Sequence, residues 1–557
     1  SMPFHKSARL AALLLAAVFL PLTCSGCSLP FQKQDGDGSG YLFTASLTSN
    51  PKSLDPQSAT DASSKTIIEN LYEGLMELDE TGTPQPAAAE SYTISPDGCT
   101  YTFVLHNDRY WFFDENQNDE IDDGEKWAVT AADYVYAFQR IFNPETQSPY
   151  ADAFSCLKNA QAIQSGQADY TTIGVQAISS TQLQFTLDHP NTRFLSLLAT
   201  TAAMPCSQSF FEQTKGRYGL DQDSVASCGA FYMRLWFYDP YGKDNLIYMR
   251  RNAANTPARS VSPTNLTFQI RNTQQAAADD FAAGNADVLV TPIQQTQYTD
   301  SENYTTTAER ATTLGLIFNP DFAAFHNANI RKGLSMGINR FAIGKNSNDD
   351  LKGAFSIIPP AVQYNGSTYR EQVPEAEAAY DPNAALTTFQ TGMQELHMES
   401  LDSTKILVCS ALMDCDNLHD IIQTWQEVFG FYIGIDEVTE DEYWQRLASK
   451  NYSIAVYGIT GSANDPAAVL EQFASDTNAF YYENASVDTQ IQALGDCSSS
   501  AQLLTQCSQL EQTILSDYWF LPIFYKNQYC ITSTKNADIA YDAFSGALNF
   551  RNAKHFE

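Results

Sequence analysis

Several motifs that carry catalysis are absent from this 557-residue sequence. It has no GxSxG nucleophile elbow, no HExxH zinc motif, no phosphate-binding P-loop and no GxGxxG after a strand. None of its seven histidines stands three or four residues from another, which excludes a pair of histidine metal ligands on one helix turn. A Ser-His-Asp set assembled only in space stays open. The absences favour a binding protein over an enzyme.

Basic residues are also scarce. There are 32 Lys and Arg against 65 Asp and Glu, for a formal charge of −33. A chain this acidic repels polyanions, which excludes nucleic acid as a partner. After the N-terminal segment, no apolar run reaches the ~20 residues that a membrane-spanning helix needs. The length exceeds what one hydrophobic core serves, so we expect at least two lobes.

The N-terminal segment is typical of an export signal. Three basic residues precede the apolar run LAALLLAAVFLPL, which is too short to span a membrane. Ser25 and Gly26 then stand before Cys27, as in the lipobox of bacterial lipoproteins, whose cysteine is acylated. We expect a lipoprotein signal peptide over 1–27 and a flexible tether over 28–40. The mature protein would lie outside the cytoplasm, anchored to the cell membrane by lipid at Cys27. A plain secretory signal is the alternative.

Nine cysteines follow Cys27, so at least one is unpaired if the others form bridges. Export permits disulfides without requiring them. Spacing makes three pairs candidates: Cys497 with Cys507, Cys409 with Cys415, and Cys206 with Cys228. No CxxC occurs among the nine, so zinc-ribbon and thioredoxin-like sites lack support.

Strand and helix patterns are mixed along the whole chain. We expect strands over 41–49, 95–105, 313–320, 404–409, 431–438 and 453–459, and helices over 63–76, 130–142, 329–343, 416–429 and 440–449. Thr130 is the expected N-cap of its helix, and Gly430 is the expected stop after 416–429. The alternation from 404 to 459 indicates an α/β lobe whose helices cover the sheet.

The stretch DENQNDEIDDGE, from Asp114 to Glu125, is rich in carboxylates. Its order fits a structural calcium loop of the EF-hand kind, with Asp119 at the sixth place where glycine is usual. Aspartate accepts a positive φ better than most residues. The candidate ligands are Asp114, Asn116, Asn118, Glu120, Asp122 and Glu125. The alternative is a solvated acidic hairpin. We expect no required cofactor, with Ca²⁺ as the one candidate ion.

Four groups of residues resemble the solute-binding lipoproteins of peptide-type ABC importers, the family of oligopeptide, dipeptide and nickel binders. The opening NPKSLDPQSATD with IIENLYEGLMELDETGTPQPAAAESYTISPDGCTYTFVL is similar to that of the family, and DDGEKWAVTAADYVYAFQRIFNP follows it. SCGAFYM and IRKGLSMGINRFAI resemble a turn and a helix of the family. QTWQEVFGFYIGI, SIAVYGITGSANDPAAVL and LPIFYKNQYCI complete the likeness, which runs from about Tyr41 to Tyr529. In relatives the acidic loop is much shorter, so most of it is an insertion.

The resemblance implies an α/β fold of the periplasmic-binding-protein-like Venus-flytrap type. Two lobes would close over a ligand in the cleft between them, and an extra domain would be inserted in the first lobe. Closure would be stabilised by the ligand's greater affinity for the closed form. Family topology implies lobe I over 41–72, 174–272 and 521–557, the extra domain over 73–173, and lobe II over 273–520.

The resemblance also implies where a ligand would bind. In the peptide binders of this family, an Asp in the loop after the strand that matches 453–459 pairs with the amino terminus of the ligand. Aligning Asn464 and Asp465 puts Ser462 at that place, so the usual charge is missing. One wall would hold Tyr457, Ser462, Asn464 and Asp465.

The other wall would hold Cys228, Gly229 and Phe231, whose backbone would pair with an extended peptide. Core packing is the competing role for Phe231 and for Tyr457 of the first wall. Asn319, at the end of the strand 313–320, is a further candidate contact.

We therefore predict an extracytoplasmic lipoprotein, not an enzyme, that delivers an oligopeptide to an ABC permease in the membrane. A non-peptide or N-blocked ligand is one alternative, because the usual Asp is missing at Ser462. A sensor on the same fold is another. An exported hydrolase that uses acidic residues as acid and base is the alternative from a different class.

Overall fold

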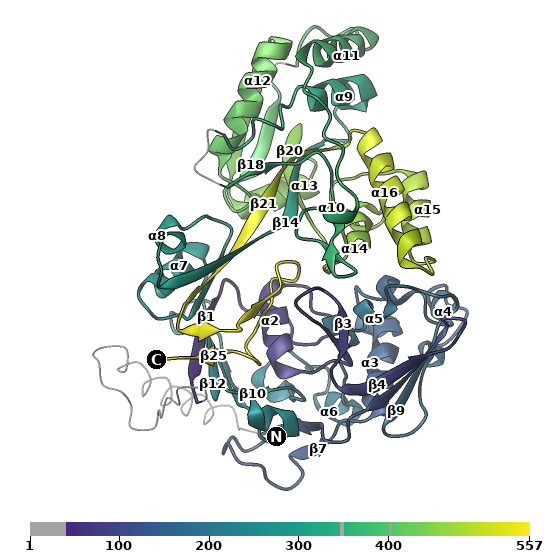
Figure 1. The fold of residues 1–557 in the computed structure, drawn as a ribbon, viewed down its shortest axis with the longest axis vertical. Coiled ribbons are helices and arrows are strands. Elements are labelled where there is room, and N and C mark those ends of the chain that lie inside the picture. Colours follow the sequence, from purple (N-terminus) through teal and green to yellow (C-terminus); the bar gives the residue numbers. More distant parts are fainter. Residues whose placement is uncertain (1–39, 346–349, 402) are drawn as a thin grey trace.

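The computed structural model describes residues 40–345, 350–401 and 403–557. The chain forms two bodies, one above the other in Figure 1, which two long strands join along one side. The predicted export signal, nearly all of the tether and Cys27 lie outside the described residues. Within the described ranges, no helix is long and apolar enough to cross a membrane.

The lower body contains a four-stranded sheet in the order β1-β12-β11-β10. Its strands are β1 (Leu42–Leu47), β12 (Asn265–Ile270), β11 (Leu246–Arg251) and β10 (Phe231–Phe237). β1 pairs with β12 in parallel, and the remaining neighbours are antiparallel. Helix α2 (Ala62–Leu71) lies against β10. Its N-cap is Asp61, whose side chain accepts the backbone N–H of Ser64.

A second four-stranded sheet, in the order β4-β5-β9-β8, completes the lower body. It consists of β4 (Ala89–Ile94), β5 (Thr100–Leu105), β9 (Gln182–Thr186) and β8 (Val175–Ala177). Helix α3 (Ala131–Phe142) packs on it, and the Asp133 carboxylate accepts the N–H of Thr130 at 2.9 Å at the start of the helix. The two sheets of the lower body share one continuous hydrophobic core.

Short elements connect the two sheets of the lower body. They are β2 (Met76–Leu78), β3 (Pro84–Pro86), β6 (Tyr110–Phe112), β7 (Lys126–Ala128), α4 (Ala160–Gln164), α5 (Phe194–Leu197) and α6 (Gln208–Gln213). Residues 540–550 of the C-terminal segment also run along α2, where the side chain of Asn70 donates to the carbonyl of Leu548 at 2.9 Å.

The upper body is built on one mixed sheet in the order β13-β21-β14-β20-β18-β19. Its strands are β13 (Val288–Thr291), β21 (Phe520–Ser533), β14 (Tyr304–Phe318), β20 (Ile454–Thr460), β18 (Lys405–Cys409) and β19 (Gly434–Val438). One face of the sheet packs against α9 (Ala328–Met336), α11 (Pro382–Glu395) and α12 (His419–Phe429). The other face packs against α10 (Tyr369–Gln372), α13 (Glu440–Ala448), α14 (Pro466–Leu470), α15 (Ala485–Leu494) and α16 (Ser500–Ser516). Helices on both faces bury the centre of the sheet, as in α/β lobes, whereas residues 304–310 of β14 and the edge strand β19 stay partly or fully exposed.

β14 and β21 are the strands that join the two bodies. They pair in antiparallel register from Tyr304 opposite Ser533 to Ile317 opposite Phe520. At their lower end β13 pairs with β21, and the carboxylate of Asp287 accepts the N–H of Thr44 in β1 at 2.7 Å. Helices α7 (Gln274–Ala282) and α8 (Thr296–Thr299) lie beside this junction (Figure 1). Two adjacent strands bend more easily than a broad interface, so we expect this junction to act as the hinge between the two bodies.

Many expected elements are confirmed, and the differences have local causes. α3, α13, β18 and β20 begin and end within two residues of their expected bounds. The helix expected over 63–76 ends at Leu71, because Tyr72 is extended and Met76 already belongs to β2. The expected domain boundaries stay a prediction. Two sheets cross the expected boundaries. β8 and β9, expected in lobe I, form one sheet with β5 of the expected extra domain, and β21, expected in lobe I, pairs with β14 of the expected lobe II.

The expected disulfides are wrong. All nine cysteines of the described residues are free thiols. Cys206 and Cys228 are each buried in the core of the lower body, and Cys497 directs its thiol to the side-chain oxygen of Gln506 at 3.1 Å. Burial raises the pKa of Cys206 to about 12, which disfavours the thiolate needed for disulfide exchange.

Candidate functional site

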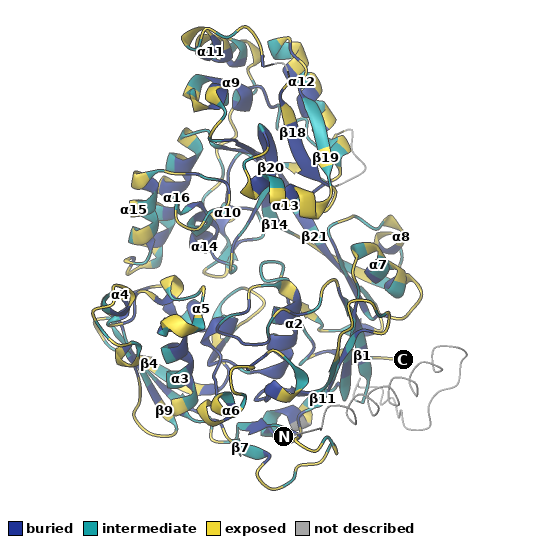
Figure 2. Cartoon of the chain, turned by 180° about the vertical axis from the view of Figure 1, so that it is seen from behind, coloured by how far each residue is buried: buried dark blue, intermediate teal, exposed yellow. Residues whose placement is uncertain are grey.

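The two bodies face each other between the hinge and a second contact on the opposite side. Figures 1 and 2 show the hinge strands on one side, and α14 and α15 approaching the region of α4 and α5 on the other. At this second contact, the N–H of Thr192 donates to the carbonyl of Cys497 at 3.1 Å. The surfaces between hinge and contact are the candidate ligand site.

Tyr457 in β20 is one of the residues expected on the upper wall of the site. Its ring contacts Phe480, with centroids 4.9 Å apart, and burial raises the pKa of its hydroxyl. β20 alternates its side chains, so Val456 and Ile454 enter the core against α12 while Tyr457 and Ile459 face the opposite core. Tyr457 is only partly buried, which leaves part of its ring exposed beside the packed core.

The loop after β20 holds the three other residues expected on this surface. Ser462 is exposed, and the side-chain oxygen of Asn464 accepts the N–H of Gln363 at 2.7 Å, so Asn464 anchors a neighbouring loop. Asp465 is the N-cap of α14 and accepts the N–H of Ala467 at 2.7 Å. Ser462, Asn464 and Asp465 thus lie in one loop after β20, and Asn464 and Asp465 are engaged in contacts within the upper body. Their role in ligand binding, and that of Tyr457, stays a prediction.

Asp465 is also bound by an arginine of the lower body. The Nε of Arg193 contacts the Asp465 carboxylate at 2.5 Å, and its Nη1 contacts the Glu471 carboxylate at 2.7 Å. The side chains of Arg193 and Asp465 are 8% and 11% exposed. The Asp465 carboxylate is thus already neutralised by the protein and is not free to pair with a ligand ammonium group.

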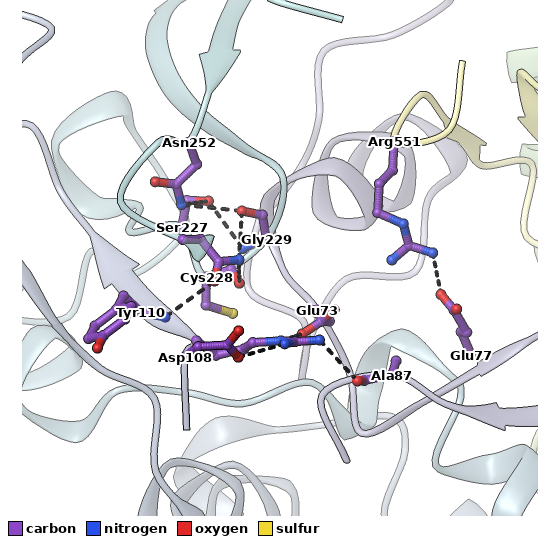
Figure 3. Close-up of polar contacts among 12 residues, drawn as sticks. Glu73, Glu77, Ala87, Asp108, Tyr110, Ser227, Cys228, Gly229, Asn252 and Arg551 are labelled. Carbon is purple, nitrogen blue, oxygen red and sulfur yellow. Dashed lines mark hydrogen bonds and ion pairs between the residues drawn. The ribbon is translucent and has the colours of Figure 1, made fainter. Parts of the chain in front are cut away.

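The lower surface is backed by the segment that contains Cys228, Gly229 and Phe231, and all three are buried. The N–H groups of Cys228 and Gly229 donate to the carbonyl of Leu71 at 3.1 and 2.8 Å, where α2 leaves its last carbonyls without helical partners. The side chain of Asn252 donates to the carbonyl of Gly229 at 3.2 Å (Figure 3). These backbone groups are therefore engaged inside the wall, and in this conformation they do not offer the peptide-pairing edge expected from the resemblance.

Gly229 is required by this close approach. A Cβ on Gly229 would lie 2.9 Å from the carbonyl carbon and oxygen of Leu71 and from the carbonyl carbon of Tyr72. These are backbone atoms, which cannot rotate away as a flexible side chain can. The segment after Ser227 is therefore held rigidly against the end of α2.

Charged residues at the lower surface were not identified from the sequence. Glu73 accepts from the Nε of Arg109 at 2.9 Å, and Asp108 accepts from its Nη1 at 2.7 Å (Figure 3). Beside them Arg551 of the C-terminal segment pairs with Glu77. Glu73 lies in the YEGL stretch quoted for the family resemblance, which is the one sequence signal that points to this place.

Glu69, in the last turn of α2, carries a carboxyl group with a shifted pKa. Burial raises its pKa to about 7, and the nearby Asp542 carboxylate adds to the shift. Arg551 and Lys65 oppose the shift without cancelling it. The same Asp542 also raises the pKa of Glu309 in β14, although burial is the larger cause there.

Asn319 does not lie with the other expected site residues. β14 and β20 are antiparallel, so Asn319 stands beside the start of β20, at the end opposite Ser462. Its amide donates to the carbonyls of Lys450 and Tyr452 at 2.8 and 2.6 Å. Asn319 also lines a polar cavity of about 390 Å³ in the upper body. Its role in this structure is to close the turn after β14.

The acidic loop lies in the lower body, and its polar groups bind one another. Asp114 accepts the N–H groups of Asn118 and Asp119 at 3.2 and 2.8 Å, and Glu125 accepts those of Glu115 and Asp122 at 2.7 and 2.9 Å. Asp119 has φ 60°, the conformation that glycine usually takes at this place.

The remaining candidate ligands of the loop are also accounted for. The amides of Asn116 and Asn118 both donate to Asp122, and Glu120 is exposed. Asp119 pairs with Arg234 at 2.9 Å. Among the described residues no group of three or more His, Cys, Asp or Glu is arranged to hold a metal ion. The calcium loop and its alternative, an acidic hairpin, both stay predictions.

Comparison with known proteins identifies the family. The family described as "Bacterial extracellular solute-binding proteins, family 5 Middle" matches residues 83–481. The chain belongs to this family. Its members are binding proteins and not enzymes, so the absence of catalytic motifs in the sequence agrees with the assignment.

Family 5 relatives are similar over nearly the whole chain. The oligopeptide-binding protein OppA of Bacillus subtilis (strain 168) is 24% identical over 542 residues, which is 94% of each chain. The solved structure of the pheromone receptor PrgZ, described by its mode of peptide binding, superposes with a TM-score of 0.75 at 23% identity and covers 93% of this chain and 99% of that one. The expected fold is thereby confirmed.

A second solved protein has the same fold. The murein tripeptide binding protein MppA of Escherichia coli superposes with a TM-score of 0.74 at 19% identity, covering 94% of this chain and all of that one. The unliganded open form of MppA superposes with a TM-score of 0.66, covering 94% of this chain and 99% of that one.

Proposed function

We propose that this family 5 protein is the extracytoplasmic receptor of an ABC importer and that its ligand is an oligopeptide. The proposal is supported by a relative of similar length that is named for oligopeptide binding and by likeness to a peptide-binding receptor. The observation that carries it is the architecture itself. Two bodies are joined by the two strands β14 and β21 and meet again at Arg193, with their facing surfaces between.

Such a molecule converts ligand binding into a change of shape. A ligand held between the bodies contacts both of them only in the closed state, so its affinity for that state is greater and closure follows. A membrane partner that recognises both bodies together would distinguish the loaded form from the empty one. An ABC permease is that partner in this proposal.

The ligand would be read by the upper surface around Tyr457, Ser462 and Asn464. The exposed hydroxyl of Ser462 and the partly exposed ring of Tyr457 can contact backbone and side chains of a peptide without a fixed charge. Because Asp465 is occupied by Arg193, a free ammonium group on the ligand is not required here. Blocked and unblocked peptides would bind with similar affinity at this end.

Cys27 would hold the protein at the outer face of the cell membrane through its lipid, with residues 28–40 as the tether. The polar, glycine-containing sequence QKQDGDGSG gives such a tether its flexibility. One lipid-modified cysteine keeps the receptor near its permease while leaving the two bodies free to open and close.

Calorimetry with synthetic peptides tests the proposed function. The protein from residue 40 onward would first be freed of bound ligand by reversible unfolding. It would then be titrated with a mixed oligopeptide pool, with free amino acids and, as a non-peptide compound, with a bile salt. Heat with the oligopeptide pool, weaker in Ser462→Trp because the larger side chain blocks the surface, is the expected result. Binding only by a non-peptide compound would contradict the proposal.

A further inference from the structure

The second contact between the bodies is centred on one buried arginine. Arg193 of the lower body contacts Asp465 at 2.5 Å and Glu471 at 2.7 Å, and both carboxylates belong to the upper body. The contacts span 272 and 278 positions of sequence. Since 8% of the Arg193 side chain is exposed, water is largely excluded from this pair.

Two further contacts surround the arginine. The backbone N–H of Thr192 donates to the carbonyl of Cys497 at 3.1 Å. The Nε2 of His189 lies 2.9 Å from the carbonyl of Gly495 and 3.0 Å from the carboxylate of Asp496. Residues 189–193 therefore touch the upper body at two separate places, at the side of the molecule opposite the hinge (Figures 1 and 2).

Each half of the ion pair is fixed by its own body before the halves meet. Asp465 is held as the N-cap of α14 by its bond from the N–H of Ala467. Arg193 stands directly before α5, and its N–H donates to the side chain of Asn191 at 2.8 Å. Phe194 anchors α5 by packing its ring against Tyr101 and Phe185. Little conformational entropy is therefore lost when the bodies close.

We propose that Arg193 is a latch that holds the two bodies closed without ligand and thereby raises the apparent affinity for ligand. Opening at the hinge separates Arg193 from both carboxylates, and no other contact of the latch survives the separation. The closed state gains charge-assisted hydrogen bonds that the open state exchanges for bonds to water. A ligand that binds the closed state meets a larger competent population, so its apparent dissociation constant is lower.

The size of the effect follows from the bonds. A hydrogen bond to a charged partner contributes enough to change an equilibrium on the order of tenfold to a hundredfold. Removing the guanidinium should therefore lower the ratio of closed to open molecules by about this factor. The two acidic partners differ: Glu471 is 35% exposed, so its loss has the smaller effect.

Small-angle X-ray scattering on the ligand-free protein tests the latch. The protein from residue 40 onward would be unfolded in guanidinium, dialysed free of small molecules and refolded. We expect a compact wild type and a larger radius of gyration for Arg193→Gln. Asp465→Asn should open the protein in the same way, because asparagine keeps the N-cap and removes the charge. The double variant should be no more open than either single one.

Arg217→Gln is the matched control. Arg217 forms an ion pair with Asp221 within the lower body at 2.6 Å, with no part in the contact between bodies. It should leave the radius of gyration unchanged. The latch is refuted if Arg193→Gln and Asp465→Asn both scatter like the wild type. If Arg193→Gln does not fold, Asp465→Asn and Glu471→Gln decide the question. None of these measurements uses a ligand, so the latch can fail while the proposed function stands.

Discussion

Replacing Gly229 by alanine perturbs the rigid wall at the lower surface of the candidate site. The added Cβ would lie 2.9 Å from three backbone atoms of Leu71 and Tyr72. Ordinary contact begins near 3.4 Å, so the segment after Ser227 must move away from α2 by about half an ångström. That movement stretches the bonds from the N–H groups of Cys228 and Gly229 to the carbonyl of Leu71.

The magnitude follows from these two effects. Overpacking in a well-packed region costs about 1–3 kcal/mol. Weakening two backbone hydrogen bonds adds about 1 kcal/mol each. Gly229→Ala should therefore lower the free energy of unfolding of the lower body by roughly 3–5 kcal/mol.

Equilibrium unfolding in urea, followed by tryptophan fluorescence and circular dichroism, measures this loss. The matched control is Gly434→Ala, since a Cβ on Gly434 of β19 would meet only the Cγ of Lys405 at 3.6 Å. The control should unfold within about 1 kcal/mol of the wild type. If Gly229→Ala is as stable as its control, the lower wall is not held rigidly against α2 and the argument for a preformed surface fails.

Three further predictions follow from the charged and sulfur-containing groups. Glu69 has an ordinary pKa of 4.5 and a pKa of about 7 in the folded protein, so between these values the folded state binds more protons than the unfolded one. The contribution of Glu69 to stability is fully present below pH 4.5 and is lost as the pH rises through 7. The free energy of unfolding of Glu69→Gln, measured in urea, should therefore rise by about 1–3 kcal/mol relative to the wild type between pH 4.5 and pH 8. A difference between the two proteins that stays constant with pH would contradict the shifted pKa. Calcium should give no heat by calorimetry and no change in melting temperature, because Asp114 and Glu125 already accept backbone N–H groups; a one-to-one isotherm that Glu125→Gln abolishes would establish the calcium loop instead. The protein from residue 40 onward, denatured without reductant, should react with a thiol reagent at all nine cysteines, and a count of seven or fewer would show a disulfide that the structure lacks.

Local sequence signals were sufficient for much of the upper body. The stop at Gly430 marks the end of α12 as expected, because it satisfies orphan backbone groups within a few residues. The structure adds Thr439 as the N-cap of α13. The alternation of Ile454, Val456 and Ile459 sets the two faces of β20 in the same way. Such elements are determined by their own residues, which explains why the expected bounds of β20 and the expected end of α12 are confirmed.

The candidate site depends on pairs that are distant in sequence. Arg193 and Asp465 meet across 272 positions, and neither residue carries a local pattern that announces the other. The resemblance named the loop after β20 as one wall of the site, which stays a prediction, and it could not show that Asp465 pairs with Arg193. For Cys228 and Gly229 it indicated a peptide-pairing edge, whereas the packing against Leu71 uses their N–H groups inside the wall.

Native mass spectrometry of the protein from residue 40 onward, purified without denaturation, tests the central claim most directly. We expect a protein peak accompanied by peaks of higher mass from bound ligands. After release and fragmentation, these ligands should give the series of mass differences that amino-acid residues produce. Arg193→Gln should retain less of this material through purification than Arg217→Gln, because its closed state is less populated. A single bound mass without an amino-acid ladder would contradict the assignment of an oligopeptide ligand.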